Sequence, residues 1–345
     1  MPGKTPEHIL VLRFSALGDA AMASPLLKVY ARANPNVKFT MVSSPMLEPL
    51  FEGEGNLSYF ATDLKGRHNG LKGLYKLFKE LMGLKPTKVA DINSVLRTFI
   101  LRAFFTAKLI PLAYMRKGRK EKRELTRKEG KVLRQLIPTV RRYELALVKL
   151  GLKDLKFGLQ SENPELVRPR RGCDKESYVI GVAPFATHKG KIWPVERMEE
   201  LVSRLSQDKR FRILFFGGGK KEIAILKGWE QKYSGVKSLA GTCSFREELN
   251  AIGETDLMVC MDSANMHFAS CLKVPVISIW GATHIYAGFY GLGQSSSMAV
   301  QSDIECRPCS IFGKKECFRG DYACLDQITT DMAEQKILNF FSGQL

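Results

Sequence analysis

The chain has 345 residues, 45% of them apolar and 26% charged, a composition typical of a globular protein long enough for two domains. The first apolar run, over 9–12, is too short for an export leader, and Arg102 and Lys108 interrupt the longest apolar region, 98–114. We therefore expect a cytoplasmic protein without a membrane-spanning helix. Eight cysteines in such a chain do not indicate a disulfide scaffold.

The formal net charge of +18 is concentrated in the first half of the chain. Residues 1–170 carry 32 Lys and Arg against 15 Asp and Glu, whereas residues 171–345 are close to neutral. The segment 97–142 alone has 15 basic and three acidic residues. Such a surface attracts nucleic acid, a phosphorylated glycolipid or an anionic membrane. A solvated charged loop is the alternative interpretation.

The first half opens with a strand, a loop and a helix. Residues 9–13 (ILVLR) have the pattern of a short buried strand, and a helix is expected over 19–33. The loop between them has Gly18 but no G-x-G-x-x-G, which argues against a nicotinamide or flavin dinucleotide site. Asp19 lies in the first helical turn, where a carboxylate is favoured by the helix dipole. The strands and helices expected next lie over 38–43, 59–62, 71–82, 88–92 and 140–150.

The second half repeats this alternation after an expected interdomain linker over 161–174, which is rich in proline and charge and has no periodicity. Strands are expected over 178–183, 211–216, 257–261 and 274–280, and helices over 194–205, 244–253 and 331–341. Alternating strands and helices predict parallel sheets with crossover helices. The fold class is therefore α/β, with two doubly wound domains facing a cleft.

The stretch 257–272 joins a buried strand (LMVCM) directly to a helix start (DSANMHFASCL). Open α/β sheets bind ligands at such carboxyl ends of strands. The N–H groups of Ser263, Ala264 and Asn265 would point at one spot, where the helix dipole favours an anion. Asp262 and His267 flank this spot. A helix cap formed by Asp262 and a core position for His267 are the alternative.

Other strand ends of the second half contribute similar chemistry. Thr187, Lys191 and Thr283 follow expected strands, and Glu222 follows a triple glycine. Hydroxyls, a lysine and a helix N-terminus suit a diphosphate, and a carboxylate such as Glu222 can accept from two ribose hydroxyls. The chain has no Walker A loop, which argues against phosphoryl transfer from a triphosphate. With Asp19 as a base on the opposite side, this layout predicts a glycosyltransferase.

Several motifs together carry a family resemblance: ILVLRFSALGDAAMASPLL, T-x-x-x-K-x-W-P, FFGGGKKE, D-S-A-N-x-H and IWGATH. With them, nearly the whole chain resembles the family 9 glycosyltransferases, heptosyltransferases that build the inner core of bacterial lipopolysaccharide. The resemblance implies the glycosyltransferase B type fold with two Rossmann-like domains. These would be a basic acceptor-binding domain over 1–165, a nucleotide-sugar-binding domain over 172–327, and a terminal helix over 328–345 that packs back toward the first domain.

The resemblance also implies the reaction and its residues. Heptose would pass from ADP-heptose to a hydroxyl of the inner core, with inversion and without a metal or other cofactor. Asp19 would be the general base, and Lys191 would stabilise the departing diphosphate. Many relatives have Gly at the position of Ala264. The alanine adds a methyl group close to the expected phosphate. The implied donor-binding residues are Thr187, Glu222, Asp262, Ser263, Ala264, Asn265, His267 and Thr283.

The family's acceptor is a phosphorylated, Kdo-bearing lipid A in the inner leaflet. The resemblance therefore implies an anionic glycolipid partner and a peripheral place on the cytoplasmic face of the inner membrane, with no nucleic acid bound. Nearby Phe99, Phe104 and Phe105 would either enter the interface or pack in the core. The implied acceptor or membrane surface comprises Arg116, Lys117, Arg119, Lys120, Lys122 and Arg123.

Four late cysteines have the spacing C-x2-C-x7-C-x6-C. This spacing suits a structural zinc, although a reduced metal-free loop or labile disulfides would also explain it. Neighbouring Lys314, Lys315 and Arg319 are expected to lower the thiol pKa values. The cysteines are Cys306, Cys309, Cys317 and Cys324.

Two alternatives to the heptosyltransferase hypothesis remain open from the sequence. The same fold could use another nucleotide sugar or another surface-polysaccharide acceptor. The basic half could instead belong to a nucleic-acid-binding protein, which would bind DNA or RNA in a salt-sensitive way. A binding module without catalysis is disfavoured because Asp19 and Lys191 are both present.

Overall fold

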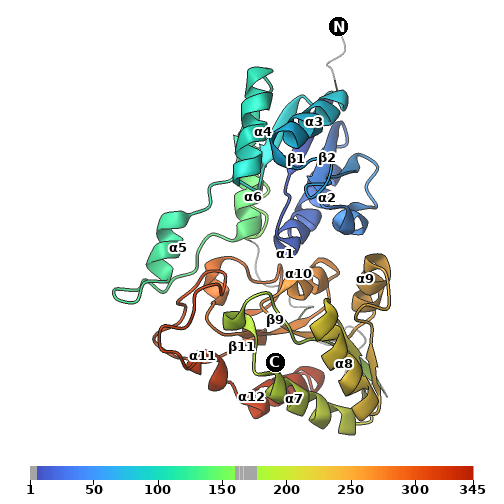
Figure 1. The fold of residues 1–345 in the computed structure, drawn as a ribbon, viewed down its shortest axis with the longest axis vertical. Coiled ribbons are helices and arrows are strands. Elements are labelled where there is room, and N and C mark those ends of the chain that lie inside the picture. The colour runs from blue at the N-terminus through green and yellow to red at the C-terminus, as the bar shows by residue number, and fades with distance from the viewer. Residues whose placement is uncertain (1–5, 160–162, 164–165, 167–176, 345) are drawn as a thin grey trace. The chain divides into compact units, whose positions relative to one another are not determined.

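The computed structural model describes residues 6–159, 163, 166 and 177–344, and the chain divides into two compact units (Figure 1). Unit 1 comprises Met1–Gly118 and Ile137–Leu159, and unit 2 comprises Arg119–Leu136 and Gln160–Leu345. The expected linker over 161–174 lies outside the described residues, except for positions 163 and 166. The division differs from the expected domains because Arg119–Leu136 belongs to unit 2.

Unit 1 is built on a parallel sheet with the strand order β3-β2-β1-β4-β5. Its strands are β1 (Glu7–Leu12), β2 (Val37–Ser43), β3 (Leu57–Ala61), β4 (Lys88–Asp91) and β5 (Leu112–Tyr114). Strand β1 pairs with both β2 and β4, so the winding direction reverses beside β1. Ligands bind in open α/β sheets at the carboxyl ends of strands beside such a reversal, and Asp19 follows β1 there.

The helices of unit 1 cover this sheet with apolar faces. They are α1 (Leu17–Ala21), α2 (Ala23–Ala33), α3 (Gly70–Gly83), α4 (Leu96–Ala107) and α6 (Thr139–Lys149). The helix expected over 19–33 begins earlier and is interrupted at Met22. Leu77 of α3 and Leu101 and Phe105 of α4 pack in one core cluster with Leu10 and Val89 of the sheet. The apolar region 98–114 is therefore split between a helix and a short strand.

Unit 2 contains a second parallel sheet with the order β11-β10-β9-β6-β7-β8. Its strands are β6 (Tyr178–Ala183), β7 (Phe211–Phe215), β8 (Val236–Ser238), β9 (Leu257–Met261), β10 (Val276–Trp280) and β11 (Ala299–Gln301). Here the reversal lies between β6 and β9, which pair in register from Ile180 with Leu257. The expected doubly wound α/β class is confirmed in both units.

Apart from α5, which precedes β6, the helices of unit 2 follow its strands in the chain. They are α5 (Arg119–Leu125), α7 (Val195–Gln207), α8 (Lys220–Lys232), α9 (Phe245–Gly253), α10 (Ala264–Cys271), α11 (Ala323–Asp326) and α12 (Thr330–Phe341). Ser244 and Glu247 form the capping box that opens α9, as their spacing predicts. Within the described part of the chain, no helix combines the length and the apolar content that a bilayer crossing requires.

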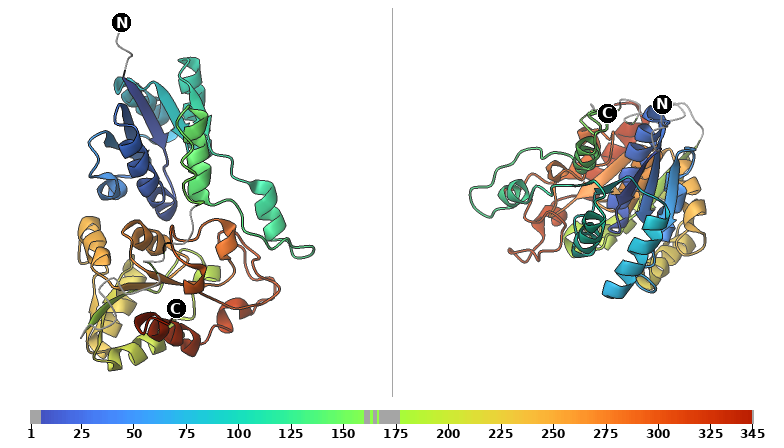
Figure 2. Two further views of the ribbon diagram at one scale, coloured as in Figure 1. Left: turned by 180° about the vertical axis from the view of Figure 1, so that it is seen from behind. Right: turned by 90° about the horizontal axis from the view of Figure 1, so that it is seen from above.

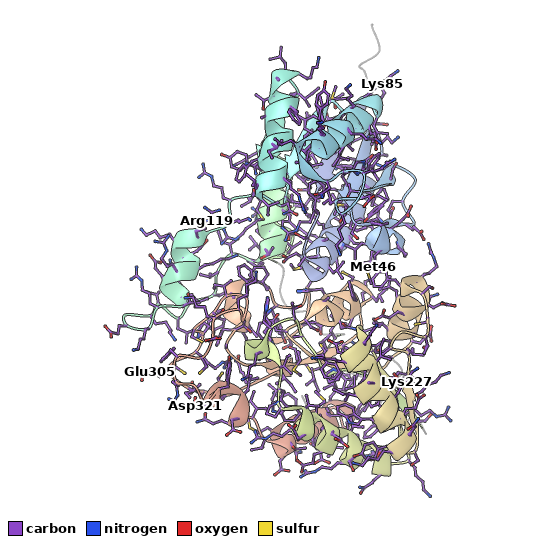
Figure 3. The ribbon with its side chains drawn as sticks, viewed as in Figure 1. Met46, Lys85, Arg119, Lys227, Glu305 and Asp321 are labelled. Atoms are coloured by element: carbon purple, nitrogen blue, oxygen red, sulfur yellow. The ribbon has the colours of Figure 1, made fainter. Side chains whose placement is uncertain are left out.

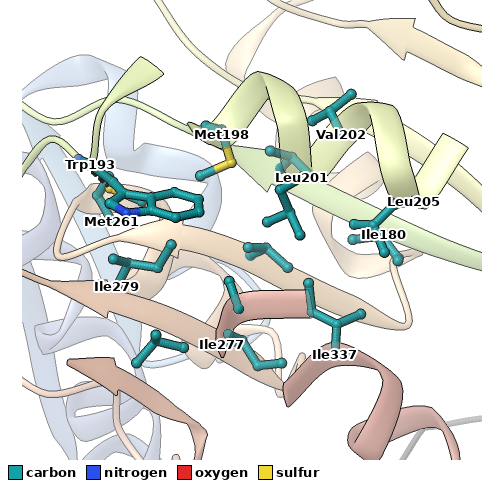
Figure 4. Packing of buried hydrophobic residues seen from close by; sticks show 14 of the residues in the cluster. Ile180, Trp193, Met198, Leu201, Val202, Leu205, Met261, Ile277, Ile279 and Ile337 are labelled. Atoms are coloured by element: carbon teal, nitrogen blue, oxygen red, sulfur yellow. Dashed lines mark hydrogen bonds between the residues drawn. The ribbon is translucent and has the colours of Figure 1, made fainter. Parts of the chain in front are cut away.

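The terminal helix α12 packs inside unit 2, against α7 and β11 (Figures 1 and 2). Its Ile337 lies among Ile277, Leu205 and other core side chains (Figure 4). The ring of Phe341 is centred 4.5 Å from that of Tyr178. Residues 328–345 were expected to pack toward the first domain. These contacts of α12 lie instead within unit 2. Burial of its apolar face on its own sheet is the physical reason.

Candidate active site

Three residues meet where β6, β9 and β10 of unit 2 end. The Nζ atom of Lys191 lies 2.8 Å from Oδ2 of Asp262, and the Thr283 hydroxyl donates to the same oxygen at 2.8 Å. Asp262 is only 4% exposed, so little water reaches its carboxylate. The interactions with Lys191 and Thr283 replace that lost hydration. The pair thus fixes a lysine cation at the carboxyl edge of the sheet.

Two glycines bring Lys191 to this position. The carbonyl of Gly190 accepts from the N–H of Ala282 at 2.8 Å, joining the loop after β6 to the loop after β10. A Cβ atom on Gly190 would lie 3.0 Å from the Cβ of Ala282, so a larger residue would push these loops apart. Gly313 has φ +70°, and a Cβ there would lie 2.7 Å from Cγ of Lys191. The lysine stem therefore rests directly on backbone.

The N-terminus of α10 adjoins Asp262 in sequence. Asp262 does not cap this helix: the N-cap residue is Ser263, whose side chain makes no capping hydrogen bond. Among the described residues, Oγ of Ser263 and Nδ2 of Asn265 are buried polar atoms that no hydrogen-bond partner reaches. Buried donors of this kind are normally satisfied, and these lie beside backbone N–H groups that favour an anion. His267 is buried in the next turn.

Glu222 lies in the first turn of α8, after the triple glycine. Its Oε2 accepts from the N–H of Gly218 at 2.8 Å, and Gly219 begins the helix with φ +89°. Only glycine adopts this backbone conformation without strain. The loop therefore holds Glu222 at the carboxyl end of β7. Thr187 is exposed in the loop after β6.

In unit 1, Asp19 forms an ion pair with Arg13, the residue directly after β1. Arg13 is 5% exposed and also donates from Nη1 to the carbonyl of Ile92 at 2.7 Å. Its guanidinium lies over the ring of Tyr143, whose hydroxyl donates to the Asp19 carbonyl at 3.1 Å. Asp19 itself retains 21% of its side-chain exposure. A partly exposed carboxylate is thus held by a buried cation.

The loop that carries Asp19 is tied to the adjacent strand end. Oδ1 of Asn93, after β4, accepts from the backbone N–H groups of Phe14 at 2.7 Å and Ser15 at 3.2 Å. Asp91 in turn accepts from the N–H of Asn93 at 2.8 Å. The carboxyl ends of β1 and β4 therefore form one hydrogen-bonded network.

Comparison with protein families decides the classification. The model of glycosyltransferase family 9 (heptosyltransferase) matches residues 105–318, more than half of the chain. The chain belongs to glycosyltransferase family 9. The family resemblance found in the motifs is confirmed, and the protein is a glycosyltransferase.

Individual family 9 relatives match over most of their length. Lipooligosaccharide heptosyltransferase 2 of Campylobacter jejuni is 24% identical over 332 residues, covering 93% of this chain and 95% of that protein. The crystal structure of a family 9 glycosyltransferase from Veillonella parvula superposes with a TM-score of 0.72 at 19% identity, covering 99% of both chains. Escherichia coli heptosyltransferase WaaC with ADP gives 0.67 at 18% identity, covering 96% of this chain and 99% of that one. These likenesses support two Rossmann-like domains.

Two arginines of this protein belong to the site but were not predicted from the sequence. The first is Arg13. Its position directly after an apolar strand could have indicated a role at the strand end. Arg307 is the other, and it is 5% exposed. It donates to the carbonyls of Gly281 at 2.6 Å and Thr283 at 2.9 Å, and so shapes the loop after β10. The sequence near Arg307 gave no signal for this role.

The six basic residues expected to form one surface are divided between the units. Arg116 and Lys117 belong to unit 1, and the other four lie on α5 in unit 2 (Figure 3, where Arg119 is labelled). Lys122 lies 4.5 Å from the ring centre of Phe289. The segment 119–136, which we call the basic arm, is docked by Leu125 and Leu136 against Ala287. Arg119, Lys120 and Arg123 remain exposed.

Two of the late cysteines, Cys309 and Cys324, do not show the expected acidity. Burial raises the pKa of the Cys324 thiol to about 11 and also raises that of Cys309. The expectation that nearby basic residues lower these pKa values was wrong for both thiols, because desolvation outweighs the charges. Cys306, Cys309, Cys317 and Cys324 are all free thiols. In the ranges that the structure describes, no three His, Cys, Asp or Glu side chains are arranged to hold a metal ion.

Proposed function

We propose that this enzyme transfers heptose from ADP-heptose to a hydroxyl of the lipopolysaccharide inner core, with inversion and without a metal ion. The observation that carries the proposal is the group formed by Lys191, Asp262 and Thr283 beside the start of α10. It combines a positioned cation, a helix N-terminus and the unpartnered donors of Ser263 and Asn265, which together match a diphosphate. The names of the Campylobacter and E. coli relatives support heptose as the sugar.

The donor groups have distinct roles in this mechanism. Lys191 contacts the diphosphate oxygens, where negative charge increases as the glycosidic bond breaks. The α10 N–H groups at Ser263, Ala264 and Asn265 supply the same stabilisation, and Asp262 accepts from a sugar hydroxyl. Glu222 accepts from the ribose hydroxyls, with Thr187, His267 and Thr283 completing the donor site. A lysine and a helix end supply the positive charge that a divalent cation supplies in metal-dependent transferases.

Asp19 is the proposed general base. It accepts the proton of the acceptor hydroxyl while that oxygen attacks the anomeric carbon from the face opposite the diphosphate, which inverts the configuration. The ion pair with Arg13 supports this role because it fixes one oxygen of the carboxylate. The other oxygen is then the one that receives the proton.

The acceptor is proposed to be an anionic glycolipid of the Kdo–lipid A type at the inner-leaflet surface. Exposed Arg119, Lys120 and Arg123 of the basic arm, together with Arg116 and Lys117, supply the complementary charge, and Lys122 adds to it. Each cation near an anionic surface contributes about 1 kcal/mol, and salt weakens that contribution. On this proposal, the enzyme acts on the cytoplasmic face of the inner membrane.

The test is an assay of purified enzyme with a panel of nucleotide sugars and a Kdo–lipid A acceptor. We expect ADP release from ADP-heptose, unchanged turnover in the presence of EDTA, and an inverted anomeric configuration in the product by NMR. Release of nucleotide only from another donor would overturn the heptose assignment and favour the alternative within the same fold. Tight DNA or RNA binding at physiological salt, without transfer, would favour the nucleic-acid alternative.

A further inference from the structure

Helices α3 and α4 of unit 1 expose large apolar side chains that the core of this unit does not bury. Leu96 is 75% exposed, Leu71 66%, Tyr75 48% and Phe99 47%. The two helices pack side by side (Figure 1), and Tyr75 contacts Phe104 edge-on at 5.6 Å between ring centres. We call this surface the α3–α4 face. Several large apolar side chains exposed on two adjacent helices are a feature of interaction sites.

These side chains are additional to the core. Helix α3 already buries Leu74, Leu77 and Leu81 against the sheet, and α4 buries Leu101 and Phe105. The exposed set is not part of this buried core, so folding of unit 1 does not need it. Leaving these side chains in water is unfavourable, because exposed apolar area is not removed from solvent.

An arginine holds the aromatic part of the face in place. The guanidinium of Arg102 lies 4.5 Å from the ring centre of Phe99 and 4.1 Å from that of Tyr114. Its Nε donates to Oδ2 of buried Asp91 at 2.6 Å, which anchors the arginine to the end of β4. Phe99 and Tyr114 are therefore presented outward on a fixed cation. Ordering their rings in advance reduces the entropy lost on binding.

The charge on this face is almost entirely positive. Lys72, Lys76 and Lys79 recur at helical spacing on α3 and are exposed, and Arg97 is exposed on α4. Glu80 is the sole acidic residue within the two helices, and it is ion-paired with Arg67. A mixed apolar and basic surface of this composition matches an anionic bilayer, where lysines meet headgroups and apolar groups enter the acyl boundary.

We propose that the α3–α4 face is a membrane-docking surface of the enzyme, in addition to the basic arm, with Leu96 and Phe99 inserting into an anionic lipid bilayer. The proposal rests on the membrane-embedded acceptor of the proposed function. A second copy of the chain fits the face less well. A symmetric dimer would set the same lysines near each other with no carboxylate to pair them.

The experiment measures co-sedimentation of the full-length protein with vesicles. Vesicles of phosphatidylethanolamine and phosphatidylglycerol should bind it, and phosphatidylcholine vesicles should not. The double variant Leu96→Ser/Phe99→Ser should bind about tenfold less tightly, since two inserted apolar side chains are removed. Met332→Ser, on α12 of unit 2 and 41% exposed, is the matched control and should bind like wild type.

A gain-of-function variant keeps the test valid if the serine variant folds poorly. Leu96→Trp should bind the anionic vesicles more tightly than wild type, because tryptophan favours the interface. Equal binding by wild type, Leu96→Trp and the serine variant would overturn the proposal. So would self-association in sedimentation equilibrium that is lost in the serine variant, because a second copy would then occupy the face.

A water-soluble, delipidated acceptor separates this proposal from the proposed function. With it, the serine variant should keep wild-type turnover, and with acceptor embedded in vesicles it should show a raised KM. Loss of turnover with both acceptors would overturn the docking assignment. Absence of ADP release from wild type with either acceptor would overturn the proposed function, while vesicle binding would still decide the docking surface.

Discussion

Lys191 and Asp262 form a largely buried ion pair, with Nζ and Oδ2 2.8 Å apart and side-chain exposures of 17% and 5%. Breaking a buried pair from one side is strongly destabilising because it leaves one charge without its partner. A cation tied to a carboxylate is also fixed before the donor arrives, so it needs no reorganisation as charge develops on a diphosphate.

Lys191→Ala should therefore lower both donor affinity and turnover, and destabilise unit 2 by about 3 kcal/mol. Tryptophan fluorescence in urea reports that unit alone, since Trp193, Trp229 and Trp280 all lie in it. Lys191→Ala/Asp262→Asn should recover most of the stability but not the donor affinity. Lys189→Ala, at an exposed position two residues earlier, is the control and should leave stability unchanged. Equal donor affinity in Lys191→Ala and wild type would remove Lys191 from the site.

Asp19→Ala should abolish most turnover while donor affinity stays close to that of wild type. A general base typically contributes 10²–10⁴-fold, so we expect a loss of about 10³-fold in kcat. Isothermal titration with ADP and a single-turnover assay measure the two quantities separately. Glu48→Ala, which removes another exposed carboxylate of unit 1, should retain wild-type turnover. Near-normal turnover in Asp19→Ala would show that another group takes the proton.

Arg13 is a positioning residue that acts through Asp19. Arg13→Met should lower kcat, because Asp19 loses the ion pair that holds one of its carboxylate oxygens in place. Donor affinity, measured by isothermal titration with ADP, should stay close to that of wild type. Arg13→Lys should restore part of kcat, because a cation again faces Asp19. An unchanged kcat in Arg13→Met would contradict this role.

The sequence predicted local structure well where the signal is local. The strands over 178–183 and 257–261 appear at their expected bounds because five or more apolar residues leave few alternatives to a buried strand. The capping box of Ser244 and Glu247 was equally visible, since both halves of the motif lie within four residues. Helix α5 was not expected, because its RKEKREL sequence lacks an apolar stripe.

Contacts between distant segments were not predictable in the same way. Lys191 and Asp262 were each predicted to contact a ligand, but not to pair with each other. Their pairing depends on the close approach of Gly190 to Ala282 and on the space that Gly313 leaves for the lysine stem. The docking of the basic arm depends on Leu125 and Leu136, two ordinary leucines in a charged segment. Such contacts follow from tertiary packing, which a single sequence does not display.

His284, next to Thr283, supplies a pH-dependent prediction about stability. Burial, assisted by Arg307 and Lys131, lowers its pKa from 6.5 to about 4, and its Nδ1 accepts from the N–H of Tyr286 at 3.1 Å. Because the folded state disfavours the charged imidazole, this stability is fully present above pH 6.5 and is lost as pH falls toward 4. The linkage amounts to about 3 kcal/mol at most.

His284→Asn removes this titration and retains a side-chain acceptor for the N–H of Tyr286. The variant and wild type should therefore have similar urea midpoints by tryptophan fluorescence at pH 7.5, and wild type should weaken faster as pH falls from 6.5 to 4.5. The difference between the two curves isolates His284, because every other carboxylate and histidine is common to both proteins. Parallel curves across this range would mean that the imidazole becomes protonated without disturbing the loop, and that the carbonyls held by Arg307 do not depend on a neutral His284.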